Sequence, residues 1–202
     1  MANLCGDTMH KKYNYVEDGR PMDHDNLAEM YLNNTWRPNL SVVGASGLPD
    51  TSIAGNVVRA STTLALSLRL PPSAPAMETE AKLIEKLTTN PPHNAKVTAS
   101  SVCEPGQGWC MKDMAPWLDD AVKKAGSDFF EGNDTGTYGM GGSIPFLCEL
   151  ERMYPSTFIL ALGLIGPQAN AHAPNEAINL PFAKKLTKAL SHLIAEVGAK
   201  QD

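Results

Sequence analysis

The chain has 202 residues, which is enough for one large domain or two small ones. Hydrophobic residues make up 43% of it and charged residues 19%, as in ordinary globular proteins, and the formal net charge is −5. This charge provides no basic surface for nucleic acid or for a membrane. No apolar run approaches the roughly 20 residues that are needed to span a bilayer.

The four cysteines are scattered along the sequence, and none of them is spaced for a zinc or redox motif. Residues Met1–Asp18 lack the apolar segment of a signal peptide. We therefore expect reduced thiols and a cytoplasmic location.

The first 34 residues are polar, and Asp23-His24-Asp25 is their densest cluster. A metal site is one interpretation of this cluster. A solvated turn is favoured, because no second group of ligands stands at helical or hairpin spacing. Asp23 or Asp25 is then expected to cap a helix that begins near Leu27.

The next segment predicts an extended stretch, a loop and a long strand. Pro38 disfavours helix in Thr35–Val43, and glycine and proline mark a loop over Gly44–Gly55. Leucines alternate with polar or small residues near the end of Asn56–Leu70, which is the period of a strand. Pro71-Pro72 ends that strand.

An amphipathic helix is predicted over Met77–Thr88, and another strand over Lys96–Val102. A helix between two strands with half-polar faces indicates an α/β layer packed on one side only. A further helix is predicted over Pro116–Phe130.

The stretch from Tyr138 to Glu176 carries the densest set of chemical signals. It runs from a glycine-rich turn through an apolar helix pattern to a predicted strand over Phe158–Ile165. A polar loop over Gly166–Glu176 follows, and it contains His172. Loops at the carboxyl ends of strands are where α/β proteins place their chemistry. A long amphipathic helix over Leu180–Val197 then follows, with Pro181 in its first turn.

Two motifs in this stretch resemble a known family. Gly-Gly-Ser-Ile-Pro at 141–145, followed by a strand and by His-Ala-Pro-Asn-Glu at 172–176, resembles the C-terminal part of the zinc-dependent two-metal amidohydrolases. These include aminoacylases, carboxypeptidase G, succinyl-diaminopimelate desuccinylase and carnosinase-type dipeptidases. Trp36-Arg37-Pro38, Gly47-Leu48-Pro49 and Ser67-Leu68-Arg69 are similar to that family's lid.

The resemblance implies an α/β fold in two parts. Residues 1–112 would form part of a two-layer, ferredoxin-like lid, which is also the family's dimerisation domain. Residues 113–202 would form the C-terminal segment of the α/β zinc-hydrolase catalytic domain. A homodimer through the lid is therefore expected, and the expected substrate is a small peptide or an N-acyl amino acid.

The resemblance also implies a role for six residues. His172 would be a zinc ligand, with Glu176 or a backbone carbonyl holding its ring. Gly142, Ser143 and Arg69 would bind the substrate carboxylate, as helix N-termini and guanidinium groups can. Asn56, thirteen residues before Arg69, would lie near the scissile carbonyl. Ser143 does not sit in a Gly-x-Ser-x-Gly elbow, so it is not interpreted as a nucleophile.

The sequence also departs from the family pattern. Met140 stands where relatives often have an acidic residue, and the sequence has no His-x-Asp motif, Glu-Glu pair or His-Ser-Gly element. One histidine cannot hold a catalytic zinc, which takes about three protein ligands and a water. We therefore expect a fragment of such a hydrolase, inactive alone, with the general base in an N-terminal half. The alternative is a naturally short, non-catalytic dimerisation or binding module.

Overall fold

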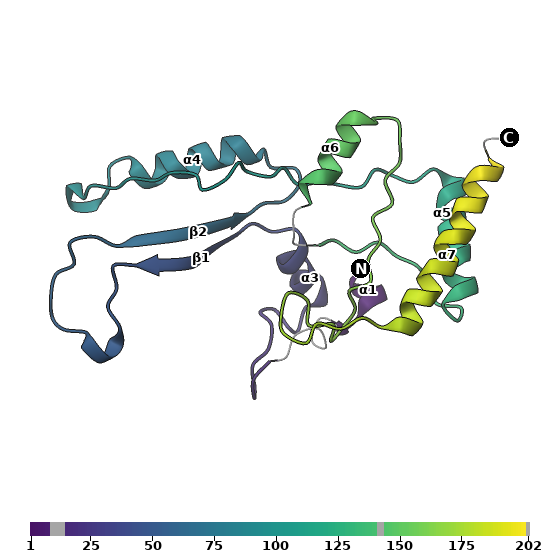
Figure 1. Cartoon of the computed structure of the whole chain (residues 1–202), viewed down its shortest axis with the longest axis horizontal. Helices are drawn as coiled ribbons and strands as arrows, with labels where there is room; N and C mark the ends of the chain where they lie inside the picture. Colours follow the sequence, from purple (N-terminus) through teal and green to yellow (C-terminus); the bar gives the residue numbers. More distant parts are fainter. Residues whose placement is uncertain (9–14, 141–143, 201–202) are drawn as a thin grey trace. The chain divides into compact units, whose positions relative to one another are not determined.

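The computed structural model describes residues 1–8, 15–140 and 144–200 and divides into two compact units (Figure 1). The first unit contains Met1–Leu32, Cys110–Gly139 and Glu149–Asp202, and the second contains Asn33–Trp109 and Met140–Cys148. Each unit thus combines segments that are far apart in the sequence. The assignment of residues 1–112 to a lid and 113–202 to a catalytic domain stays a prediction.

The N-terminal core of the first unit lies between two helices, α1 (Ala2–Cys5) and α3 (Leu27–Thr35). Met30 and Tyr31 are buried there, and the Tyr31 hydroxyl donates a 3.2 Å hydrogen bond to the Gly6 carbonyl. The cap of α3 corrects one prediction. The Asn26 side chain, rather than that of Asp23 or Asp25, accepts the Glu29 N–H at 3.3 Å, because Asn26 directly precedes the helix.

Two long helices, α5 (Pro116–Phe129) and α7 (Leu180–Ala199), make the second core of this unit. Their apolar stripes predicted both helices to within two residues. Ala125, Ala189 and Leu193 are buried between them. The helices are antiparallel, because the first turn of α5 lies near the end of α7 and the last turn of α5 lies near its start. The contacts that show this are Lys200 over the Trp117 ring and the Phe130–Phe182 ring pair.

The second unit contains the only sheet among the described residues, an antiparallel pair of β1 (Asn39–Ser46) and β2 (Thr63–Arg69). Leu40 lies opposite Leu68 and Val42 opposite Leu66, and a bulge follows at Val43. The loop between the strands includes a short 3₁₀ turn, η1 (Thr51–Ile53). The predicted strand over Asn56–Leu70 is therefore correct only in its second half, because loop backbone occupies the first.

Two helices and a second short turn complete this part of the chain. Helix α4 (Ala76–Thr88) matches the predicted amphipathic helix, and η2 (Pro92–Asn94) follows it. Helix α6 (Pro145–Met153) follows the glycine-rich turn and continues from the second unit into the first.

Two predicted strands do not form in the structure. Phe158–Ile165 and Lys96–Val102 belong to no strand or helix. A β-strand requires a neighbouring chain to complete its hydrogen-bond ladder, and apolar alternation alone does not supply one. Leu160 instead packs against the core between α5 and α7, while Leu162 and Ile165 are 49% and 57% exposed.

The combination of helices with a small antiparallel sheet confirms the predicted α/β class. No helix in the described part of the chain is long and apolar enough to cross a membrane.

Candidate functional site

His172 lies on the loop that leads directly into α7. The loop closes on itself, because the Ala177 N–H donates to the Ala169 carbonyl at 2.9 Å. Inside it, the Asn170 side-chain amide donates to the Pro174 carbonyl at 2.5 Å. The Asn179 side chain then caps α7 by accepting the Phe182 N–H at 3.0 Å. Both ends of the loop that carries His172 are therefore fixed by hydrogen bonds.

This loop contains an unusual number of left-handed backbone conformations. Gln168, Asn170, His172 and Asn175 have φ values of 65°, 54°, 63° and 62°. Such values are uncommon outside glycine, and asparagine and histidine are among the residues that tolerate them best. Residues held in this region are often found at functional sites. The conformation leaves the His172 side chain exposed to solvent, where its imidazole is available to a ligand.

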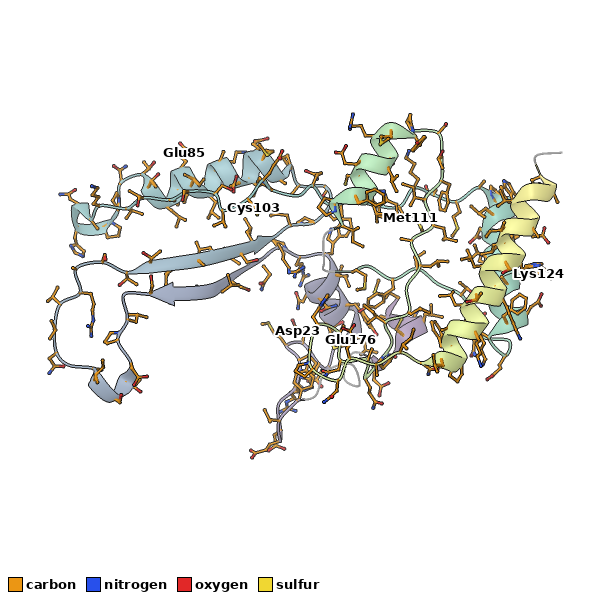
Figure 2. The ribbon with its side chains drawn as sticks, in the orientation of Figure 1. Asp23, Glu85, Cys103, Met111, Lys124 and Glu176 are labelled. Atoms are coloured by element: carbon orange, nitrogen blue, oxygen red, sulfur yellow. The ribbon has the colours of Figure 1, made fainter. Side chains whose placement is uncertain are left out.

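Glu176 follows on the same loop and is also exposed (Figure 2). The loop thus brings the predicted metal ligand and its predicted supporting carboxylate into one closed turn of chain. The Asn170–Pro174 hydrogen bond closes the part of this turn that contains His172.

The described residues do not form a metal centre by themselves. Among them, no group of three or more His, Cys, Asp or Glu side chains could hold a metal ion. A catalytic zinc takes about three protein ligands and a water, so His172 alone cannot hold one. The Asp23-His24-Asp25 cluster forms a turn in which His24 lies 3.1 Å from the Asp25 carboxylate and 3.3 Å from the Arg20 guanidinium.

Arg69 and Asn56 both belong to the second unit but lie beyond opposite ends of β2. Arg69 is the last residue of the strand and pairs with Asn39, whereas Asn56 lies at a bend in the loop before the strand. Six residue steps of strand separate Thr63 from Arg69, a distance of about 20 Å at the usual rise per residue. Both side chains are exposed, but this unit does not bring them together.

The glycine-rich turn is described only in part. Gly142 and Ser143, the two predicted carboxylate-binding residues of the turn, lie outside the described residues. Helix α6 begins two residues after Ser143, at Pro145. Met140, where the resemblance predicts an acidic residue, is 58% exposed.

One residue with three side-chain hydrogen bonds was not singled out from the sequence. Gln107 bonds to the turn that joins β2 to α4 and, through its backbone, to Cys148 of α6. A lone glutamine gives only a weak sequence signal of such a role. Its position between two glycines, Gly106 and Gly108, is the only local hint.

Comparison with known proteins shows similarity both in sequence and in fold. No family model matches the chain. A cysteinylglycine-S-conjugate dipeptidase of Corynebacterium striatum is 28% identical over 149 residues, which are 71% of this chain and 31% of that protein. The chain thus spans about a third of the length of the relative that it matches.

The fold is shared with two solved structures. The dipeptidase Dug1p of Saccharomyces cerevisiae matches with a TM-score of 0.63 and 19% identity, over 85% of this chain and 36% of that one. The M20 family metallo-carboxypeptidase Sso-CP2 of Sulfolobus solfataricus matches with a TM-score of 0.61 and 16% identity, over 94% of this chain and 40% of that one. The chain is therefore similar in sequence to a dipeptidase and in fold to part of an M20 family metallopeptidase, which confirms the resemblance indicated by the two motifs.

Proposed function

We propose that this chain corresponds to the C-terminal portion of a two-metal, zinc-dependent hydrolase that cleaves dipeptides or N-acyl amino acids. The match to a dipeptidase over 71% of the chain carries the proposal. The two solved structures with the same fold support it, since the name of one describes a dipeptidase and that of the other a metallo-carboxypeptidase.

Within this proposal, the first unit contributes His172 as one zinc ligand and Glu176 as the carboxylate that orients its ring. Neutral imidazole suits zinc, and a ligating histidine usually donates its second ring N–H to an oxygen acceptor. The closed, hydrogen-bonded loop supports this role because it fixes the backbone on which the imidazole stands.

The second unit contributes the groups that recognise the substrate. Arg69, Gly142 and Ser143 bind the substrate carboxylate. Asn56 contacts the carbonyl group that is cleaved, and because β2 separates it from Arg69 within one chain, the two residues would come from two copies of the chain. A guanidinium can pair with a carboxylate through two parallel hydrogen bonds, and α6 begins just after Ser143, where its N-terminal N–H groups favour an anion. The lid of this hydrolase would comprise residues 1–112, and 113–202 would belong to its catalytic domain.

The isolated chain should not hydrolyse peptides. The sequence has neither a His-x-Asp motif nor a Glu-Glu pair, which supply most metal ligands and the general base in the family that it resembles. A water activated between two ions by a carboxylate base therefore cannot be assembled from this sequence alone.

The proposal is tested by the mass of the native protein. An antibody against residues 144–176 is used to blot a native extract. A band of more than twice the 21.7 kDa of this chain supports an intact hydrolase that contains it. A single band near 21.7 kDa contradicts that proposal and favours the second candidate.

The second candidate is a non-catalytic dimerisation or binding module, and one feature of the sheet favours it. Leu40 and Val42 of β1 are 52% and 59% exposed, and Leu66 of β2 is 38% exposed. Cross-strand partners share a face, so these residues form an apolar surface on the hairpin. We propose that two copies pair through this surface in either candidate.

The four free thiols are compatible with a reducing, cytoplasmic location.

A further inference from the structure

Gln107 connects parts of the second unit that are far apart in the sequence. Its side-chain oxygen accepts the Ala76 N–H at 3.0 Å, at the first residue of α4. Its side-chain nitrogen donates to the Pro72 carbonyl at 2.9 Å and to the Ala74 carbonyl at 3.0 Å. The side-chain amide of Gln107 thus forms hydrogen bonds with three backbone groups of the segment that follows Arg69.

The chemistry of these partners fixes the orientation of the amide. An N–H group requires the oxygen of the glutamine, and two carbonyl groups require its NH₂, so the reversed amide would face each partner with the wrong group. Neither a carboxylate nor an apolar side chain can make all three bonds. Gln107 is therefore suited to this turn in a way that residues of similar size are not.

Two neighbouring features hold Gln107 in place and extend its contacts to α6. A Cβ atom on Gly108 would lie 2.7 Å from the Cα atom of Pro72, so only glycine allows the backbone this close. The Gln107 carbonyl also accepts the Cys148 thiol at 3.3 Å. Cys148 lies one turn inside α6, the helix that follows the glycine-rich turn.

We propose that Gln107 is a positioning residue that holds the end of β2, with Arg69, and the start of α6 in one fixed arrangement for binding the substrate carboxylate. This inference rests on the proposed function, which assigns carboxylate binding to Arg69. Gln107 itself does not contact the substrate. It links the two elements through Pro72, three residues after Arg69, and through Cys148.

The test uses NMR on the full 202-residue chain, titrated with N-acetylglycine and with the corresponding amide, which lacks the carboxylate. The variants are Gln107→Leu, which removes all three side-chain bonds, and Gln107→Glu, which keeps only an acceptor for Ala76. Gly108→Ala displaces the same backbone without changing the glutamine. Gln168→Leu makes the matched change at an exposed position of the first unit.

In the wild type, N-acetylglycine should shift the signals of Arg69 and of the first turn of α6, and the amide should not. Gln107→Leu should weaken this binding between about threefold and tenfold, which corresponds to the net free energy of about one hydrogen bond. The unfolding midpoint of the first unit should not change. The chemical-shift changes of Gln107→Leu should extend to both Arg69 and α6. Gly108→Ala should act in the same direction, and Gln107→Glu should retain the slow exchange of the Ala76 amide.

The two ways of failing can be distinguished. If Gln107→Leu changes shifts only within residues 72–76 and binds N-acetylglycine as well as the wild type, the positioning role is wrong. If the wild type does not bind N-acetylglycine, carboxylate recognition by this chain is wrong. In that case, chemical-shift changes that Gln107→Leu causes at both Arg69 and α6 would still support the structural link between the two elements through Gln107. The absence of these changes would overturn it. If Gln107→Leu does not fold, Gln107→Glu and Gly108→Ala decide by the same criteria.

Discussion

At the scale of single residues, the loop that carries His172 is defined by its backbone. Four of its residues that are not glycine adopt positive φ angles, and Asn170 also provides a side-chain hydrogen bond across the turn. An L-residue in this conformation costs about 1–2 kcal/mol unless its side chain compensates. The loop is therefore sensitive to the identity of Asn170.

We predict that Asn170→Ala opens this loop and that Asn170→Gly perturbs it less. Alanine loses the bond to Pro174 and is strained at a φ of 54°, whereas glycine loses only the bond. Alanine should cost about 1–2 kcal/mol of local stability. The measurement is amide hydrogen exchange at Ala177, whose N–H closes the loop. Equal exchange rates in the two variants would show that the backbone angle does not matter.

An ion pair at the start of α7 gives a prediction about pH. The Lys185 ammonium lies 2.5 Å from the Glu131 carboxylate and holds the pKa of that carboxyl below its usual value. A lowered pKa means that the pair stabilises the fold above about pH 4.3, the usual pKa, and that this stability is lost as the pH falls through the lowered value.

We therefore predict a small, pH-dependent difference between the wild type and Glu131→Gln. The melting temperature of the wild type should be slightly higher near pH 7, and the difference should vanish in acid and in 1 M salt, because the pair is exposed. Thermal unfolding at several pH values measures this. A difference that persists at pH 2 would assign the effect to something other than the ion pair.

At the scale of elements, the pair formed by α5 and α7 is the main packed core of the first unit. Small residues at the crossing, Ala125 and Ala189, allow the two helices to approach closely, and Leu193 fills the space beside them. Beside this crossing lies an apolar hollow of about 340 Å³, lined also by Leu160 and Leu162.

Figure 2 labels Lys124 on α5, whose ammonium pairs with Asp128 on the same helix.

We predict that Leu193→Ala destabilises the first unit by about 2–4 kcal/mol, the usual cost of removing a buried leucine side chain. Leu193 is 8% exposed, whereas its neighbour Ile194 is 64% exposed. Ile194→Ala is therefore the matched control and should change stability by less than about 0.5 kcal/mol. Urea unfolding of each variant gives the comparison. Similar losses for both positions would mean that the α5–α7 core is not the stabilising element.

At the scale of the whole molecule, the exposed apolar side chains on the β1–β2 hairpin are the feature that most strongly indicates an interface with another chain. Contiguous exposed apolar residues of this kind mark interaction surfaces or sites of aggregation. Both strands also have an edge that the described residues leave unpaired, which is a template for pairing with another chain.

We predict that the chain self-associates through this face and that Val42→Lys weakens the association at least tenfold. A lysine in the centre of the face would have to be desolvated in the dimer. Ser67→Lys places the same charge on the opposite face of the hairpin, because residue 67 alternates with Leu66 and Leu68. Sedimentation equilibrium over a range of concentrations measures the association. Equal weakening by both variants would exclude this face as the specific interface.

The sequence predicted the helices well because their signals are local. The apolar stripes of α4, α5 and α7 repeat with the period of a helix, and Pro116 and Pro181 mark the first turn of α5 and of α7. The motif around His172 also predicted a polar loop before α7, and the structure has one. The roles of His172, Glu176, Arg69, Asn56, Gly142 and Ser143 stay predictions.

The strands were predicted less well, because a strand depends on a partner distant in the sequence. Phe158–Ile165 has the apolar run of a buried strand, yet the structure gives it no ladder. The sequence by itself determined the helices, the α/β class and the resemblance to metallopeptidases, all of which follow from local periodicity and short motifs. Only the tertiary structure decided which segments pair, where Arg69 lies relative to Asn56, and that Gln107 joins the turn after β2 to α6, because these depend on contacts between residues that are far apart in the chain.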